Sequence, residues 1–168
     1  MDGIPYEIER KFLIKYPKPE FLARCDDIST IEQTYLVPGE RGGTERVRKR
    51  GREGAFVYTH TEKIRINDMR RVELEEEISR EQYEGFLERA DKSRSKIAKQ
   101  RICYYYKEQM FEIDLFPFWQ DRAIMEIELR DEKQAVSFPP ELEIIKEVTS
   151  DRRYTNSSMA AAVPYEEL

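Results

Sequence analysis

The side chains best suited to chemistry in this chain are charged residues that recur at every second position. Glu7, Glu9 and Lys11 alternate with other residues in segment 6–14. Because successive Cβ atoms of a strand point to opposite faces, this spacing places all three on one face of a predicted strand. The same spacing recurs in further sets that are mainly acidic or mainly basic: Arg46, Arg48 and Arg50; Arg71, Glu73, Glu75 and Glu77; Lys99 and Arg101; Glu112 and Asp114; Glu126 and Glu128.

Such sets could bind a metal and a polyphosphate together. Closely spaced carboxylates repel one another unless cations neutralise them. Hard divalent ions such as Mg²⁺ or Mn²⁺ prefer oxygen ligands, so Glu-x-Glu pairs that face one cavity would suit them. Arginines and lysines opposite would grip phosphate oxygens, with bidentate geometry available to arginine. The combination could orient a triphosphate, spread the developing charge and activate water.

The simpler alternative is an antiparallel sheet whose charged faces meet water. Two features favour a closed sheet instead. The charged faces carry almost only full charges rather than Ser, Thr and Asn, and they divide into acidic strands and basic strands. A closed sheet would turn these faces inward and leave the Ile, Phe, Leu and Val faces outside for helices to cover. We therefore expect an α+β fold built on a β-barrel.

Fewer segments have helical patterns. Ser79 and Gln82 form a predicted capping box ahead of apolar residues at helical spacing. Short helices are also predicted over 19–25 and 131–136, and Thr149 is a candidate cap for a last helical region that runs to 162. Segment 55–64 reads as a strand that ends near Lys63. In that strand His60 falls on the face opposite Lys63, which predicts a structural role for the histidine.

Bulk properties limit the functional classes. The 168 residues fit one domain, 1–168, with 38% charged residues but a net charge of only −5. Disorder from one-sided charge and general nucleic-acid binding are therefore not expected. Cys25 and Cys103 suggest neither a zinc site nor a disulfide framework. No apolar run approaches the roughly 20 residues of a membrane span, and the N-terminus lacks a signal-peptide core, so we expect a cytoplasmic protein without a membrane partner.

The sequence also resembles a known family. Within EIERKFL, Glu7, Glu9 and Lys11 form the pattern Glu-x-Glu-x-Lys, which is similar to the N-terminal hallmark of the CYTH, or triphosphate tunnel metalloenzyme, superfamily. The match continues in order along nearly the whole chain, through Tyr35-Leu36, Arg46-Val47-Arg48, Thr61-Glu62-Lys63, Arg71-Val72-Glu73-Leu74-Glu75, Lys99-Gln100-Arg101, Phe111-Glu112-Ile113-Asp114, Glu126-Ile127-Glu128 and Val148-Thr149 to Asn156.

This resemblance implies an eight-stranded antiparallel β-barrel with a charged interior, with helices packed outside and one helix closing or lining an end. It implies that Mg²⁺ or Mn²⁺ is bound by Glu7, Glu9, Asp114, Glu126 and Glu128. The implied triphosphate-binding residues are Lys11, Arg46, Arg48, Lys63, Arg101 and Arg153, the last reaching in from the C-terminal helical segment. Among the bases, catalytic roles fall to Lys11, Arg48 and Lys63. Glu73 and Glu75 are expected to support the bases or a second metal.

One departure from the family concerns the register near Lys63. The stretch between Arg48 and Lys63 is longer than the family pattern, with an extra turn expected around 51–54. A shifted register would place His60 or Glu62 where Lys63 is assigned.

The family does not fix the reaction, because its members act on several triphosphates. The EIERKFL start and the Val-Thr-x-Asp-x-Arg-Tyr-x-Asn run resemble short inorganic tripolyphosphatases, so the first expectation is hydrolysis of tripolyphosphate to pyrophosphate and phosphate. Class IV adenylyl cyclase, thiamine or nucleoside triphosphatase, and a noncatalytic polyphosphate-binding module are alternatives. No adenine or thiamine pocket can be read, and segment 116–119 fits a hydrophobic turn equally well. The expected partner is a small triphosphate, and association into a homodimer is left open.

Overall fold

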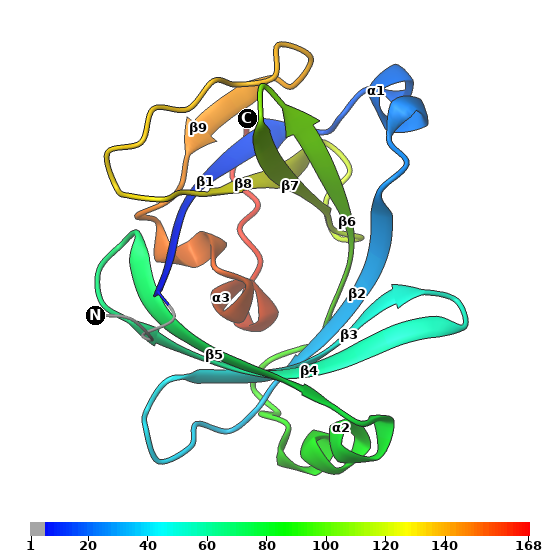
Figure 1. The fold of residues 1–168 in the computed structure, drawn as a ribbon, viewed down its shortest axis with the longest axis vertical. Helices are drawn as coiled ribbons and strands as arrows, with labels where there is room; N and C mark the ends of the chain where they lie inside the picture. The colour runs from blue at the N-terminus through cyan, green and yellow to red at the C-terminus, as the bar shows by residue number, and fades with distance from the viewer. Residues whose placement is uncertain (1–5) are drawn as a thin grey trace.

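The computed structural model describes residues 6–168, in which strands predominate (Figure 1). The elements follow one another as β1 (Tyr6–Lys15), α1 (Pro19–Arg24), β2 (Ile28–Tyr35), β3 (Thr44–Arg52), β4 (Ala55–Arg65), β5 (Arg70–Ile78), α2 (Arg80–Phe86), η1 (Leu87–Arg89), β6 (Ile97–Tyr106), β7 (Gln109–Leu115), β8 (Arg122–Glu128), β9 (Ile144–Glu147), η2 (Arg152–Tyr154) and α3 (Asn156–Ala161). None of the helices among these residues is long and apolar enough to cross a membrane.

The sheet closes on itself through β1. Its strand order is β5-β4-β3-β2-β6-β7-β8-β1-β9, and β1 also pairs with β5. From Glu9 to Lys15 β1 pairs with β8, while its first residues, Tyr6 to Ile8, pair with β5. Further along β1, Phe12 to Ile14 pair with β9, which takes over from β5 as the neighbour on that side of β1. All of these pairings are antiparallel, so the predicted eight-stranded antiparallel barrel is confirmed, with β9 added at its margin.

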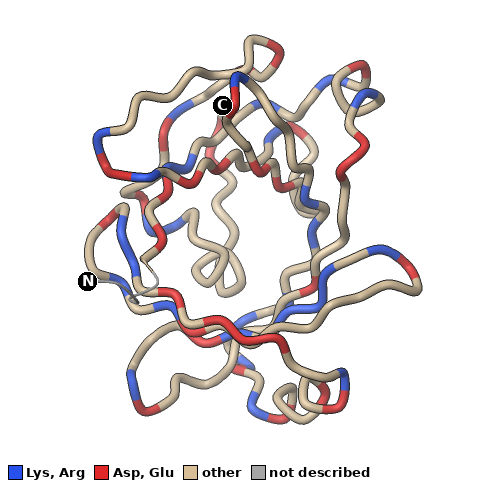
Figure 2. Tube along the Cα trace, in the orientation of Figure 1, with Lys and Arg blue, Asp and Glu red and all other residues tan. Residues whose placement is uncertain are grey.

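The strand register turns the charged sets inward. Paired residues on neighbouring strands share a face of the sheet. Glu9 lies across from Glu128, and Lys11 lies across from Glu126. Figure 2 shows acidic and basic residues along the strands that ring the interior. In the backbone register of β4 and β5, Lys63 lies across from Glu73 and keeps its inward position. The register is therefore the one assigned from the sequence, and neither His60 nor Glu62 takes the place of Lys63.

The apolar faces of the strands form two outer clusters. On one side of the barrel, Phe12, Phe111, Ile113 and Met125 are almost fully buried against α1 and the segment that follows β8. On the other side, α2 covers the outer face of β3 and β4, where Val47 packs with residues of the helix. The predicted capping box of α2 is confirmed, with Ser79 and Gln82 each bonding the other's backbone.

A third apolar cluster lies inside the barrel and closes one end of it. The inward positions Leu13, Ile97 and Ile124 are buried together with Tyr154 of η2 and Met159 of α3. In Figure 1, α3 sits within the ring of strands rather than on its outer surface. The charged interior therefore ends on an apolar floor, defined here by these five residues.

Two helix predictions were wrong in detail. Residues 131–133 form a bend and a turn, and residues 134–136 have no regular structure, so no helix forms there; the Asp131 carboxylate accepts a hydrogen bond from the backbone N–H of Lys133 and so competes with helix formation. Thr149 caps no helix: Asp151 caps η2 and Thr155 caps α3. The Thr149 hydroxyl instead accepts a hydrogen bond of 3.0 Å from the backbone N–H of Lys11.

Candidate active site in the barrel cavity

A cavity of about 480 Å³ occupies the barrel interior above the apolar floor. Its walls come from strands of both halves of the barrel and from segment 149–158. Most of the site residues expected from the sequence meet there: Glu7, Glu9, Lys11, Arg46, Arg48, Lys63, Glu73, Glu75, Arg101, Glu126 and Glu128. Asp114 and Arg153 do not line it.

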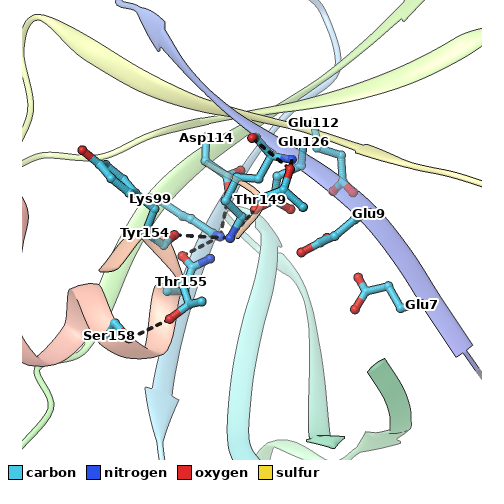
Figure 3. Close-up of polar contacts among 12 residues, drawn as sticks. Glu7, Glu9, Lys99, Glu112, Asp114, Glu126, Thr149, Tyr154, Thr155 and Ser158 are labelled. Atoms are coloured by element: carbon cyan, nitrogen blue, oxygen red, sulfur yellow. Dashed lines mark hydrogen bonds and ion pairs between the residues drawn. The ribbon is translucent and has the colours of Figure 1, made fainter. Parts of the chain in front are cut away.

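One wall of the cavity is acidic. Glu7 and Glu9 of β1 and Glu126 and Glu128 of the neighbouring β8 make up this acidic wall, and Figure 3 shows Glu7 and Glu9 projecting from β1 into the interior. Burial raises the pKa of Glu9, and the nearby charges of Glu126 and Glu7 raise it further. The pKa of Glu128 is raised by burial and then by other carboxylates, Glu7 first among them. A cation would relieve this crowding of like charges.

Bases of the same cavity hold three of the four acids. The Nζ of Lys63 lies 3.0 Å from Oε2 of Glu7, and Nη2 of Arg71 lies 3.0 Å from Oε1 of Glu9. Lys11 pairs with Glu126 at 3.3 Å. Within residues 6–168, no three Asp, Glu, His or Cys side chains are grouped as metal ligands. The acidic wall fits a hard divalent cation in its donor chemistry, since it offers carboxylate oxygens only, but its side chains must first turn away from these bases.

The wall opposite is basic. Arg46 and Arg48 of β3 form this basic wall, and β3 lies four places from β8 in either direction around the ring of strands. They are 7% and 9% exposed, and neither takes part in an ion pair formed within residues 6–168. Arg48 donates to the neutral Gln33 Oε1 at 2.9 Å, while Nε of Arg46 lacks a hydrogen-bond partner in the described part of the chain. Burial, with Arg46 and Arg101 nearby, lowers the pKa of Arg48 to about 9.

Asp114 organises the bases near the floor. Its side chain is fully buried and accepts a hydrogen bond of 2.7 Å from Lys99 Nζ (Figure 3). It also accepts a hydrogen bond of 2.7 Å from Arg101 Nε. Burial opposes ionisation, but Arg101 and Lys99 together hold the pKa of Asp114 well below its usual range. Burial also lowers the pKa of Lys99 to about 7. Both oxygens of Asp114 are thus engaged by bases, and its expected role as a metal ligand stays a prediction.

The expectation for Arg153 needs correcting. Its side chain is 60% exposed and pairs with Asp151 and Glu166 outside the cavity. The neighbouring Arg152 lines the cavity instead. The sequence offers two adjacent arginines, and only the turn of η2, with Asp151 as its cap, decides which of them lines the cavity.

Two lysines of the barrel interior, Lys11 and Lys99, bind the C-terminal segment. Nζ of Lys11 donates to the backbone carbonyl of Tyr154 at 3.3 Å, and Nζ of Lys99 donates to Oδ1 of Asn156 at 3.1 Å. These bonds hold η2 and the start of α3 against the charged side chains of the interior that lie next to the apolar floor. They are long-range contacts that alternation along the strands could not reveal.

Several interior residues were not assigned a role from the sequence. Gln33 is completely buried and links Arg48 to the Tyr35 hydroxyl, which accepts from its Nε2 at 3.0 Å. Thr61 donates its hydroxyl proton to Glu75 at 2.8 Å. Arg71 belongs to the family pattern without an assigned function, although its inward parity can be read from segment 71–77.

His60 lies on the outer face of the barrel, as its parity predicts. Its ring stacks on Phe86, and its Nε2 lies 2.8 Å from Oε1 of Glu45.

The buried pairing at Asp114 can be tested by stability. Asp114→Asn keeps the shape but leaves Lys99 and Arg101 buried beside a neutral amide, so unfolding free energy should fall by about 3–5 kcal/mol. Asp68→Asn is the control, because the Asp68 side chain is 52% exposed in its pair with Arg65 and the loss should stay below about 1 kcal/mol. Urea unfolding measures both, and equal losses would contradict the structural role of Asp114.

The comparisons with known proteins agree with this geometry. No protein-family model matches the chain. An inorganic triphosphatase of Nitrosomonas europaea is 32% identical over 161 residues, which cover 94% of this chain and 99% of the relative. A crystal structure of an inorganic triphosphatase has a TM-score of 0.58 at 29% identity, covering 95% of this chain and 97% of that one.

A protein of Pyrococcus horikoshii shares the fold, with a TM-score of 0.56 at 21% identity over 76% of this chain and 80% of its own. The likeness to the Nitrosomonas protein runs through nearly the whole of both chains, and the structure has the closed, charged barrel that the sequence motifs predict. On these grounds the chain belongs to the CYTH, or triphosphate tunnel metalloenzyme, superfamily.

Proposed function

We propose that this protein hydrolyses triphosphates and that inorganic tripolyphosphate, cleaved to pyrophosphate and phosphate, is its main substrate. The observation that carries the proposal is the basic wall. Arg46 and Arg48 are buried, face the cavity and have no carboxylate partner within residues 6–168. Buried charges are costly when unpaired, so this arrangement calls for an anion in the cavity. The name of the Nitrosomonas relative, an inorganic triphosphatase, supports the choice of that anion.

The acidic wall determines which kind of anion fits. A simple anion would be repelled by Glu7, Glu9, Glu126 and Glu128, whereas a polyphosphate with a divalent cation presents both signs of charge. Glu7, Glu9, Glu126 and Glu128 would hold Mg²⁺ or Mn²⁺ through carboxylate oxygens, with Glu73 and Glu75 in support. When bound, the cation would polarise phosphoryl oxygens and lower the pKa of a water molecule. A cytoplasmic location belongs to the same proposal.

The bases of the cavity bind, orient and stabilise the phosphates. Arg46 and Arg48 offer guanidinium donors to the phosphoryl oxygens, and Lys11 and Lys63 carry further positive charges at the border with the acidic wall. Arg101 is fixed in place by Asp114 and so needs no reorganisation during the reaction. Attack of water on a terminal phosphorus breaks its bond to the bridging oxygen, and these fixed charges stabilise the negative charge that develops. The apolar floor bounds the charged interior at one end.

The choice of substrate can be tested by product analysis. Tripolyphosphate is symmetric, so either end presents an equivalent terminal phosphate and no base or sugar must be accommodated. We expect kcat/KM for tripolyphosphate to exceed that for ATP by about 10-fold, equal to about 1.4 kcal/mol of transition-state stabilisation. ATP, if used, should release phosphate. Preferred use of ATP with formation of cyclic AMP and pyrophosphate would show a cyclase, and binding without turnover would show a noncatalytic module.

The metal-binding role of the acidic wall predicts that activity needs a divalent cation. Glu9→Gln and Glu128→Gln keep the size of the side chain but remove the charge that a hard cation prefers, so kcat/KM at limiting Mg²⁺ should fall about 100-fold or more. Glu143→Gln is the matched control, since Glu143 pairs on the outside with Lys15 and is 65% exposed. Undiminished turnover of folded Glu9→Gln and Glu128→Gln would exclude them as essential ligands.

Replacement of Arg48 should raise the stability of the ligand-free protein and lower its activity. Its guanidinium is buried against Arg46 and Arg101, so Arg48→Met should raise the unfolding free energy of the ligand-free protein by about 1 kcal/mol or more. The same variant should lose about 100-fold or more in kcat/KM, because one of the charges that stabilise the transition state is gone. Arg52→Met is the control, because within residues 6–168 Arg52 donates only to the backbone carbonyls of Ile28 and Asp26. Full activity of Arg48→Met would refute the role of the basic wall.

A further inference from the structure

Arg71 occupies the space between Glu7 and Glu9, the two acids of β1. It lies on β5 directly across from Glu7, and its guanidinium extends one inward position further along β1. Its Nη2 is 3.0 Å from Oε1 of Glu9, and its Nε is 3.7 Å from Oε2 of Glu7. Lys63, the other base on this part of the acidic wall, pairs with Glu7 alone. Arg71 is therefore the base that bridges both acids, among the residues that the structure describes.

The backbone around Arg71 is fixed, but its side chain has room to turn. The carbonyl of Met69 accepts a hydrogen bond of 3.2 Å from the backbone N–H of Glu9, which ties the start of β5 to β1. The side-chain oxygen of Asn67 accepts from the backbone N–H groups of Met69 and Arg70. The Arg71 side chain is 22% exposed and lines the barrel cavity, so its guanidinium can leave the acids without moving the strand.

We infer that Arg71 is an internal counter-ion that competes with the divalent cation for Glu7 and Glu9. In the structure its guanidinium engages both carboxylates that a cation would need, and residues 6–168 contain no ready group of three ligands. Binding of a cation then requires Arg71 to release at least Glu9. The released guanidinium remains in the cavity, where a phosphate oxygen is its natural next partner. This inference rests on the metal-dependent function proposed above.

A counter-ion of this kind couples the two ligands of the site. A phosphate that draws Arg71 away from Glu9 makes cation binding tighter, and by linkage the cation strengthens phosphate binding by the same factor. The enzyme would therefore bind the cation weakly on its own and strongly together with its substrate. Arg71 affects the cation through the two acids, and it is not itself a ligand of the cation.

The test measures Mn²⁺ binding to the full-length protein without any phosphate, by electron paramagnetic resonance of free Mn²⁺. Arg71→Gln should bind Mn²⁺ about 5- to 100-fold more tightly than the wild type, the range of typical coupling between sites. Arg65→Gln is the matched control, because Arg65 lines the same cavity but pairs with Asp68, and it should change binding by less than about 2-fold. In a Glu9→Gln background the gain from Arg71→Gln should fall below about 2-fold.

Each outcome decides between the alternatives. Equal or weaker Mn²⁺ binding by folded Arg71→Gln, with a wild type that does bind, overturns the inference and leaves the proposed function standing. Absence of Mn²⁺ binding in both proteins also overturns the inference, and if turnover of tripolyphosphate is in addition independent of Mn²⁺, the proposed metal-dependent function fails as well. If Arg71→Gln fails to fold in a thermal melt, Arg71→Lys provides the second test. Lysine keeps the charge but has a single donor group and cannot bridge both acids as the guanidinium does, so Mn²⁺ binding should tighten by at least about 2-fold, and unchanged binding would overturn the inference.

Discussion

The pairing of β1 with both β8 and β5 is the interaction on which the rest of the structure depends. It closes the sheet, so the face that would otherwise meet water becomes an interior. Once closed, a one-residue slip of β1 would turn Glu7, Glu9 and Lys11 outward and bring Ile8 and Phe12 into the cavity. The outer clusters prevent that slip, because Ile8 and Phe12 are buried on the outside of the barrel. Apolar packing outside therefore fixes the charged geometry inside.

The interior that results contains buried charges that lack a partner of opposite sign within residues 6–168. Charges in a low-dielectric cavity interact strongly, and each unpaired one is costly. The protein balances part of this charge internally, through Lys63, Arg71 and Lys11 on the acidic wall and through Asp114 near the floor. Arg46 and Arg48 are left without such a partner within residues 6–168. The site thus gains most from a ligand that carries both a cation and phosphate groups.

Much of the fold could be predicted because a strand has only two faces. The period-two pattern assigned Glu9, Arg46 and Glu128 to one interior, and the register confirms that they share it. The same parity placed His60 outside, and the inward position of Lys63 followed although the preceding stretch is long. The pattern was less informative where the chain is neither strand nor long helix. Residues 131–136 form a turn followed by irregular chain instead of a helix, and Arg152 rather than Arg153 lines the cavity.

The sequence by itself determined which residues share the barrel interior, because alternation along each strand is a local property of the backbone. The family motifs add the chemical identity of that interior. Only the tertiary structure decided which charges pair with one another. Asp114 is engaged by Lys99 and Arg101, and Arg71 rather than Lys63 bridges Glu7 and Glu9. These choices depend on strand stagger, side-chain reach and the position of α3 inside the barrel, which involve contacts between residues far apart in the chain.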